Sequence, residues 1–395
     1  MSTTQDVVLL SGVRTAIGAF GGSLKDVSAI DLGTTAIREA IARSGVQADD
    51  LGLAVMGNVI HGEGRDPYLS RVAAVNAGVP KAAPAMAVNR LCGSGLQAIV
   101  SATQSLMLGD AQAAVAGGAE SMSRGGMLVE GLRWGAKMGG TQTVDMMAAA
   151  LQDPFGHGAM GITAENVADR YGIDRQTQDA FALESQTRAA AAIEQGRFVD
   201  QIVPVSVKTR KGEVIFDTDE HPRQTSAEAL AGLRPVFKKD GSVTAGNASG
   251  INDGAAALVL ATTDYAAQKG LTPRARILAY GHAGVEPDEM GVGPVPASQL
   301  ALSRAGLSAE QLDVVESNEA FASQACYVTQ QLGLDPAKVN PNGGAIALGH
   351  PVGATGAILM VKLLHELERI NGRYGLATMC IGGGQGIAVV IERWA

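Results

Sequence analysis

Short apolar runs bounded by glycine alternate along the chain with longer segments whose apolar residues recur at helical spacing. A run that is apolar at every position, and not only at every second one, predicts a strand buried on both faces. Such strands are predicted over residues 7–10, 53–56, 113–116, 255–260, 314–315, 376–380 and 387–391. Helices are predicted over residues 29–44, 96–108, 164–170, 175–195, 297–305 and 357–370. Strands that alternate with helices predict an α/β fold.

One unit of this pattern occurs twice. Residues 36–51 and 297–312 each comprise a helix, a turn and the entry to an apolar strand, and Asp49 of the first copy corresponds to Glu310 of the second. A glycine-rich turn and a further helix follow both copies. We therefore predict two similar halves and an inserted domain. The halves are residues 1–120 with 244–271, and residues 272–395, and the insertion is residues 121–243.

Charge and composition argue against several classes of function for this protein. The net charge of −8 disfavours nucleic-acid binding, although a local basic patch could still hold a phosphorylated ligand. The chain has no apolar stretch near ~18 residues and no basic segment before its first apolar run, so we expect a cytoplasmic protein without membrane contact. Three scattered cysteines are too few for a disulfide framework or a zinc site, so each thiol either packs or reacts.

Cys92 is the first candidate for chemistry. It stands in the segment Asn-Arg-Leu-Cys-Gly-Ser-Gly, after a short apolar run and directly before a predicted helix. The free N–H groups and the dipole of a helix N-terminus favour a thiolate. The position therefore predicts a nucleophile with a lowered pKa. The alternative is a buried structural cysteine.

Three further segments carry polar groups in unusual surroundings. His350 lies in Gly-His-Pro-Val-Gly-Ala-Thr-Gly, where glycine permits close approach of a ligand and the imidazole titrates near neutral pH. The alternative for His350 is a surface loop. Cys380 ends an apolar strand and is followed by a glycine run that begins at Gly382, and Asn318 lies in a polar cluster at the end of another strand. We assign Cys326, on the helix that follows, to the core.

Together these four segments resemble the thiolase family. Cys-Gly-Ser-Gly, Asn-Glu-Ala-Phe, Gly-His-Pro-x-Gly-Ala-x-Gly and Cys-x-Gly-Gly-Gly occur in the family's order, and the likeness extends from residue 11 to the C-terminus. The chain most resembles the bacterial short-chain β-ketothiolases of polyhydroxyalkanoate metabolism. The resemblance implies a thiolase fold of two βαβαβαββ halves, stacked in five layers (αβαβα), with a loop domain inserted in the first half.

The resemblance also implies a role for each motif residue. Cys92 resembles the nucleophile that holds the acyl group as a thioester, and His350 resembles the base that activates it. Cys380 resembles the acid/base that removes the α-proton of the second acyl-CoA. Asn318, through a bound water, and His350 would stabilise the enolate oxygen. The backbone N–H groups of Cys92 and Gly382 would form the oxyanion hole.

The resemblance implies that the inserted domain takes part in binding coenzyme A. The family's CoA-binding positions match Leu151, Met160, Arg223, Ala245, Ser249, Met290, Ala320 and Phe321. Arg223 would lie by the adenine and phosphate end, and Ser249 would hydrogen-bond the pantetheine. Because CoA is a substrate and product, the resemblance implies no cofactor and no metal. It further suggests a homotetramer.

The expected activity is acetyl-CoA C-acetyltransferase, the reversible condensation and thiolysis of short-chain 3-ketoacyl-CoA with acetyl-CoA and CoA as partners. A degradative 3-ketoacyl-CoA thiolase of fatty-acid oxidation would use the same chemistry with the opposite flux. A non-catalytic acyl-CoA carrier would have lost Cys92, His350 or Cys380, and a carrier-protein-dependent ketosynthase usually lacks the second cysteine. Ala159 stands where short-chain biosynthetic relatives usually have histidine, which predicts room for a five-carbon substrate.

Overall fold

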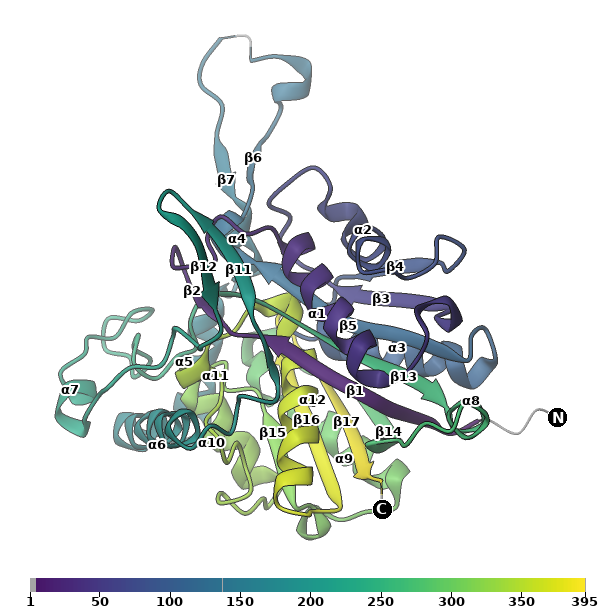
Figure 1. Ribbon diagram of the computed structural model, residues 1–395. Helices are drawn as coiled ribbons and strands as arrows, with labels where there is room; N and C mark the ends of the chain where they lie inside the picture. The colour runs from purple at the N-terminus through teal and green to yellow at the C-terminus, as the bar shows by residue number, and fades with distance from the viewer. Residues whose placement is uncertain (1–4, 137, 395) are drawn as a thin grey trace.

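An 11-stranded mixed sheet runs through the computed structural model, which describes residues 5–136 and 138–394 (Figure 1). Its main strands follow the order β15-β16-β17-β14-β1-β13-β5-β3-β4. Their bounds are β1 Val7–Thr15, β3 Leu53–Gly57, β4 Ala85–Val88, β5 Ala113–Ser121, β13 Asn252–Thr262, β14 Ala275–Gly284, β15 Val314–Ser317, β16 Tyr374–Ile381 and β17 Gln385–Arg393. Two short strands, β2 Gly18–Ala19 and β10 Ile202–Val203, pair with β13 and β1 beside this path.

The sheet consists of two similar halves that join between β1 and β14. In each half a parallel pair, β3 with β5 or β15 with β16, is followed by two antiparallel pairings, and the first half has a further parallel pair, β3 with β4. At the join, Val8 lies opposite Arg276 and Leu9 opposite Ala275. The strand order therefore contains the duplication that the repeated sequence unit predicts.

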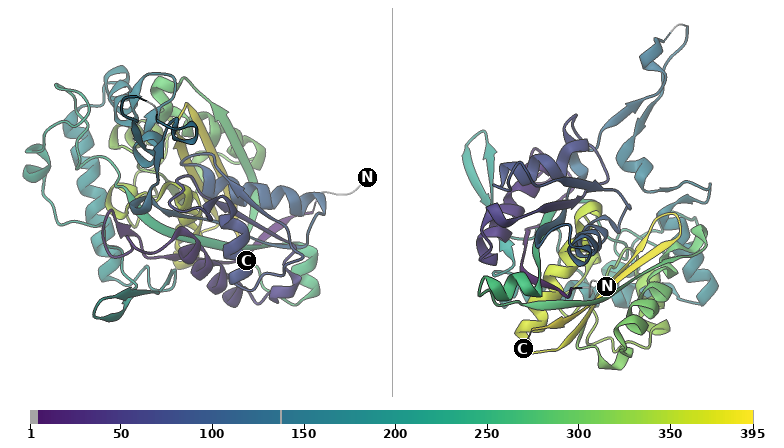
Figure 2. Two further views of the ribbon diagram at one scale, coloured as in Figure 1. Left: turned by 90° about the horizontal axis from the view of Figure 1, so that it is seen from above. Right: turned by 90° about the vertical axis from the view of Figure 1, so that its right-hand side faces the viewer.

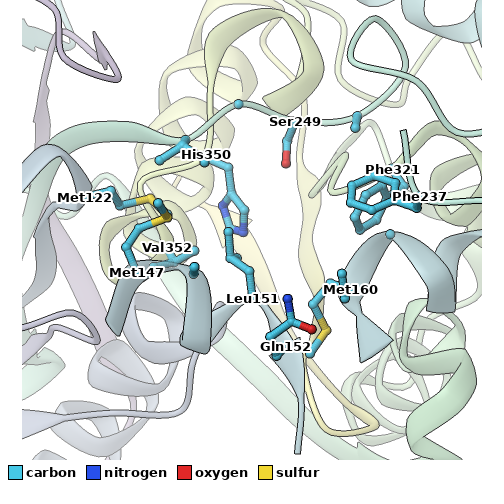
Figure 3. A pocket seen from close by; sticks show the side chains of 16 residues that line it. Met122, Met147, Leu151, Gln152, Met160, Phe237, Ser249, Phe321, His350 and Val352 are labelled. Atoms are coloured by element: carbon cyan, nitrogen blue, oxygen red, sulfur yellow. The ribbon is translucent and has the colours of Figure 1, made fainter. Parts of the chain in front are cut away.

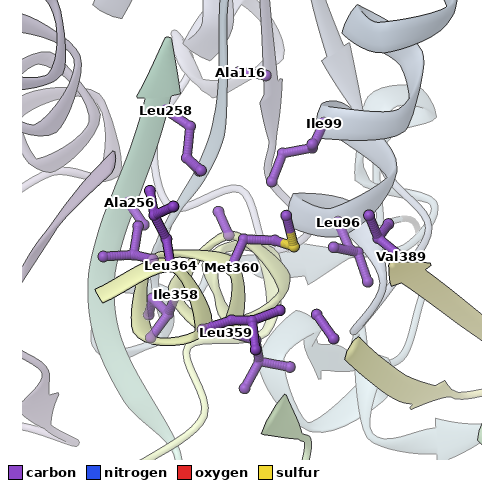
Figure 4. Packing of buried hydrophobic residues seen from close by; sticks show 14 of the residues in the cluster. Leu96, Ile99, Ala116, Ala256, Leu258, Ile358, Leu359, Met360, Leu364 and Val389 are labelled. Carbon is purple, nitrogen blue, oxygen red and sulfur yellow. The ribbon is translucent and has the colours of Figure 1, made fainter. Parts of the chain in front are cut away.

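Two helices lie between the halves, and two pairs of helices cover the outer faces (Figure 2). The central helices are α3 Ser94–Leu108 and α12 Val352–Arg369, and the outer ones are α1 Ala29–Ser44, α2 Leu69–Asn76, α9 Pro294–Ala305 and α10 Ala322–Gln331. Strand β13 is buried on both faces, because Leu258 packs inward with the central helices and Val259 packs outward with α1. Figure 4 shows Leu258 and Val389, from opposite halves, around Met360 of α12. The five layers confirm the predicted fold class.

The start of α12 differs from the sequence prediction. The helix begins at Val352 and not at residue 357, because its glycine-rich first turns are packed against α3. A Cβ on Gly95 would lie 2.8 Å from the backbone nitrogen of Ala357, and one on Gly356 would overlap the backbone nitrogen of Leu96. Glycine at these two positions lets the central helices cross backbone to backbone near their N-termini.

The segment between β5 and β13 carries the shorter elements. They are β6 Met127–Val129, β7 Thr143–Asp145, α4 Met146–Ala150, β8 Gln152–Asp153, β9 Gly158–Ala159, α5 Met160–Tyr171, α6 Arg175–Glu194, β11 Val205–Thr209, β12 Gly212–Phe216 and α7 Ala227–Ala231. Two more short helices, α8 Thr263–Gln268 and α11 Ala345–Leu348, lie outside this segment. The β6–β7 hairpin extends far from the layered body in Figures 1 and 2.

Candidate active site

Cys92 and His350 stand just before the N-termini of the two central helices. Cys92 lies two residues before the first residue of α3, and His350 lies two residues before the first residue of α12. Because these helices cross at Gly95 and Gly356, the residues that precede them converge at one end of the central layer. The crossing thus joins two motifs that are distant in the sequence.

Burial controls the state of the Cys92 thiol. The side chain is half-buried, and burial raises its pKa above the ordinary value, with a smaller contribution from the charge of Glu120. The backbone N–H groups of Gly382 and Cys92 favour the thiolate and oppose this rise in pKa. The lowered pKa predicted from the sequence is therefore wrong, because burial outweighs the helix N-terminus. Deprotonation of Cys92 requires a base.

His350 provides an unprotonated nitrogen close to the pocket. Its side chain is only 5% exposed, and its backbone N–H donates to Oδ1 of Asn252 at 2.9 Å. Nδ1 lies 2.7 Å from the hydroxyl oxygen of Thr355, whereas Nε2 has no hydrogen-bond partner among the described residues. Burial lowers the pKa of the imidazole to about 4. The ring is therefore neutral at pH 7.

Cys380 lies near the end of β16 and is fully buried. It belongs to an apolar cluster with Met160 and Phe321. Burial raises the pKa of its thiol far above the ordinary value, and the neighbouring Cys92 contributes to the same shift. The two thiols are therefore close enough to influence each other's ionisation. Beyond Cys380, Gly382 faces Met160, and a Cβ on this glycine would lie 3.1 Å from the Met160 methyl carbon.

Asn318 directly follows β15. Its backbone N–H donates to the carbonyl of Thr378 at 3.0 Å, which places it beside the strand that carries Cys380. The side chain is fully buried, and neither Oδ1 nor Nδ2 has a hydrogen-bond partner in residues 5–136 and 138–394. Buried polar atoms are nearly always hydrogen-bonded, to protein or to ordered water. The free carboxamide can thus hold a water or a substrate oxygen.

A largely apolar pocket of about 320 Å³ lies beside these groups (Figure 3). Of the predicted site residues, Leu151, Met160, Ser249, Phe321 and His350 line it. The motifs do not single out the lining residues Met122, Met147, Phe237 and Val352, because an isolated apolar side chain carries no chemical signal. Cys92 packs against the cluster that contains Met122 and Val352. Cys380 shares its cluster with Met160 and Phe321, so the two thiols flank the pocket.

A second cavity, of about 370 Å³, adjoins the first and shares Phe237, Ala248 and Ser249 with it. Arg223 and Ala245 line this second cavity, and the Arg223 side chain is exposed. Predicted CoA residues therefore line two adjoining cavities that lead from the exposed side chain of Arg223 to His350. Two of them, Met290 and Ala320, line neither cavity and pack instead in the cluster around Cys380.

Glu120 is a buried site residue that motif reasoning did not single out. Its carboxyl is fully buried and accepts backbone N–H groups from Val59 at 3.1 Å, Ile60 at 3.1 Å and Gly353 at 2.9 Å. Burial raises its pKa to about 8. These bonds tie the end of β5 to the first turn of α12. A charged residue at the end of an apolar strand is the sequence signal that could have identified it.

Among the described residues, no group of three or more His, Cys, Asp and Glu side chains is arranged to hold a metal ion. In the same part of the chain, no helix is both long and apolar enough to cross a membrane.

Comparison with known proteins gives matches along the whole chain. The family profile "Thiolase, N-terminal domain" matches residues 7–264, and "Thiolase, C-terminal domain" matches residues 271–393. The chain is 62% identical to the β-ketothiolase BktB of Cupriavidus necator, over 99% of this chain and 100% of that protein. It is 51% identical to an acetyl-CoA acetyltransferase of Pseudomonas aeruginosa, over 98% and 100% of the two chains.

Solved structures agree with the architecture. The crystal structure of the Bacillus anthracis acetyl-CoA acetyltransferase matches with a TM-score of 0.97 at 45% identity, and both chains are covered completely. The crystal structure of human mitochondrial 3-ketoacyl-CoA thiolase in complex with CoA matches with a TM-score of 0.96 at 44% identity, again over both complete chains.

Proposed function

Because the chain belongs to the thiolase family, we propose that it is an acyl-CoA acetyltransferase that condenses and cleaves short-chain 3-ketoacyl-CoA through an acyl-enzyme on Cys92. The observation that carries the proposal is the convergence of three groups on one pocket. Cys92 and Cys380 flank an apolar cavity into which His350 presents a free nitrogen. This arrangement suits two-step transfer of an acyl group.

In the first half-reaction, Nε2 of His350 takes the proton of the Cys92 thiol, and the sulfur attacks the thioester carbonyl of acetyl-CoA. The raised pKa of Cys92 and the lowered pKa of His350 keep both groups neutral at rest, so the proton moves only as the carbon–sulfur bond forms. The N–H groups of Cys92 and Gly382 stabilise the negative oxygen, a contribution of about 3 kcal/mol per donor. The bond to CoA breaks, and its sulfur leaves with a proton from Cys380.

In the second half-reaction, the Cys380 thiolate removes an α-proton from a second acetyl-CoA. The raised pKa of this thiol makes its thiolate a strong base. The enolate oxygen accepts hydrogen bonds from His350 and from a water held by the free carboxamide of Asn318. The enolate carbon attacks the acetyl carbonyl, the bond to Cys92 breaks, the Cys92 sulfur takes back its proton from Nε2 of His350, and 3-ketobutyryl-CoA forms. Thiolysis follows the same steps in reverse.

The two adjoining cavities support the assignment of the CoA site. Leu151, Met160 and Phe321 would enclose the pantetheine in the apolar pocket, and Ser249 would bond its polar groups. Arg223 would meet the adenine and phosphate end in the second cavity. We include Ala245, Met290 and Ala320 in the site. Met290 and Ala320 would not line the cavities but would pack in the cluster around Cys380. The domain limits 1–120 with 244–271, 121–243 and 272–395 are part of this proposal.

Acetylation of Cys92 tests the proposed chemistry directly. After brief incubation with acetyl-CoA and an acid quench, peptide mass mapping should find the acetyl group on Cys92, and Cys92→Ser should lose nearly all activity. Cys326 is the matched control, since burial raises the pKa of its thiol to about 12 and it lies outside the pocket. An acetyl group found only on Cys326 or Cys380 contradicts the assignment.

The physiological direction is a separate part of the proposal. The 62% identity to a protein named β-ketothiolase favours the biosynthetic, short-chain role, whereas the likeness to the human mitochondrial 3-ketoacyl-CoA thiolase favours degradation. Comparing thiolysis of four-, five- and six-carbon 3-ketoacyl-CoA with the rate of condensation distinguishes the two. A biosynthetic short-chain enzyme loses activity steeply beyond five carbons.

We further propose a cytoplasmic homotetramer that needs no metal or other cofactor. The exposed apolar residues of the projecting β6–β7 region support assembly: Met127 is 62% exposed, and Trp134 is 84% exposed. Exposed apolar patches of this kind typically mark contacts between proteins. Light scattering should report fewer subunits for the double variant that combines Met127→Ser and Trp134→Ser than for the unmodified protein. Full activity after dialysis against a chelator is the expected result for the absence of a metal.

A further inference from the structure

Thr355 contacts the His350 ring on the side away from its free nitrogen. The Thr355 side chain is 2% exposed and lies in the first turn of α12. Its hydroxyl oxygen is 2.7 Å from Nδ1 of His350 and 2.9 Å from the carbonyl oxygen of Pro351. The motif Gly-His-Pro-x-Gly-Ala-x-Gly leaves this position unspecified, so the sequence assigns it no role.

The arrangement of donors around Thr355 points to one tautomer of the histidine. A hydroxyl has one proton, and the carbonyl oxygen of Pro351 can only accept. Donation from a helical threonine to the carbonyl four residues earlier is a common side-chain bond. With its proton engaged there, the Thr355 oxygen accepts, and Nδ1 of His350 must then be the protonated nitrogen.

We propose that Thr355 is a positioning residue that holds His350 as the Nδ1–H tautomer, so that Nε2 keeps a lone pair for the proton of Cys92. The inference rests on the proposed role of His350 as the base. In the opposite tautomer Nε2 would carry the hydrogen, and this buried N–H would have no partner among the described residues. Nε2 could then not accept the proton of Cys92. Because Nδ1–H donates to Thr355 in both the neutral and the protonated ring, Nε2 can gain a proton without rearrangement.

The tautomer can be read without any measurement of activity. Histidine labelled with 15N gives different signals for protonated and unprotonated ring nitrogens, and the six histidines can be separated by the loss of one set of signals in His350→Gln. The wild type should show a protonated Nδ1 and an unprotonated Nε2 at pH 7. A protonated Nε2 in the wild type overturns the proposal.

Two substitutions and a matched control test the consequence for the reaction. Thr355→Val removes the hydroxyl at nearly constant shape and should slow acetylation of Cys92 by about 10- to 100-fold, part of what a general base contributes. Thr355→Ser keeps the hydroxyl and should acetylate within about threefold of the wild type, because the base keeps its tautomer. The control is Thr103→Val on α3, because the buried Thr103 makes the same bond to a carbonyl four residues earlier, at 2.8 Å, and has no hydrogen bond to a histidine among the described residues.

The outcomes separate this proposal from the proposed function. Equal slowing in Thr355→Val and Thr103→Val, or no slowing in Thr355→Val, overturns the role of Thr355. If His350→Gln acetylates Cys92 at the wild-type rate, the role of His350 as the base fails, and the role of Thr355 fails with it. Slow acetylation in His350→Gln with normal acetylation in Thr355→Val rejects Thr355 alone. If Thr355→Val does not fold, the labelled wild type and Thr355→Ser still decide.

Discussion

The hydroxyl of Ser185 donates a 2.7 Å hydrogen bond to the buried carboxyl of Glu319. Ser185 lies on α6, between β5 and β13 in the chain, and Glu319 directly follows Asn318 after β15. Glu319 also accepts the side-chain N–H of Asn340 at 2.8 Å and the backbone N–H of Ile346 at 3.2 Å. One fully buried carboxyl therefore ties α6, which lies between β5 and β13, to the chain that follows β15 and carries Asn318.

Ser185→Ala should destabilise the protein, because it removes one of the donors that compensate the buried carboxyl of Glu319. Leaving such a group short of a donor costs about 1–3 kcal/mol. Denaturant unfolding measures the loss. Thr187→Ala on the exposed side of the same helix is the control and should change stability by less than about 0.5 kcal/mol. Equal effects of the two substitutions would show that the bond between Ser185 and Glu319 is not important for stability.

Cys380→Ser and His350→Ala should impair different steps. Cys380→Ser should still acetylate at Cys92 but condense poorly, because the CoA thiolate can leave without a proton from Cys380, whereas removal of the α-proton requires a base. His350→Ala should slow both half-reactions, since the base and the enolate contact are lost together. Each defect should be at least about 100-fold, the usual lower contribution of a general acid or base. Rapid-quench acetylation and steady-state condensation separate the steps, and equal defects of Cys380→Ser in both would contradict this division.

Ala159→His should narrow the acyl pocket. Ala159 lines the pocket and directly precedes Met160, whose side chain faces Gly382. We expect the wild type to cleave 3-ketovaleryl-CoA well. The imidazole should lower the ratio of kcat/KM for the five-carbon substrate to kcat/KM for the four-carbon substrate. The fall should correspond to about 1–3 kcal/mol, the usual discrimination for one methylene. An unchanged ratio would mean that Ala159 does not determine chain length, and rejection of the five-carbon substrate by the wild type would refute the pocket argument itself.

The rate of Cys92 acetylation should depend weakly on pH in the mildly acidic range. His350 accepts the proton only when unprotonated, and burial lowers its pKa to about 4, so the base is lost only as the pH falls toward that value. Between pH 7 and pH 5.5 the single-turnover rate should fall less than about twofold. An ordinary histidine, with a pKa of about 6.5, would lose roughly tenfold. A tenfold fall in this range would place the imidazole in a more solvated setting than the structure gives it.

The local pattern of the sequence determined the layers and the family. Runs that are apolar at every position predict strands buried on both faces, and β13 and β16 are such strands. The repeated helix–turn–strand unit predicted two halves, which the strand order contains. The four motifs predicted the thiolase family, and the family profiles confirm it. These features depend on residues that are close together in the sequence, so the amino-acid sequence alone is sufficient to predict them.

Other features depend on packing between distant segments, and only the tertiary structure decided them. The local pattern does not predict β14, because only three of its ten residues are buried and polar residues interrupt its apolar ones. It gave the wrong direction for the pKa of Cys92, since a helix N-terminus is local but burial comes from the whole fold. The contacts of Thr355 with His350 and of Ser185 with Glu319 likewise exist only where α12 and α6 are packed in place. The motifs identify the candidate reacting residues, whereas burial and packing determine the protonation state and the orientation of their side chains.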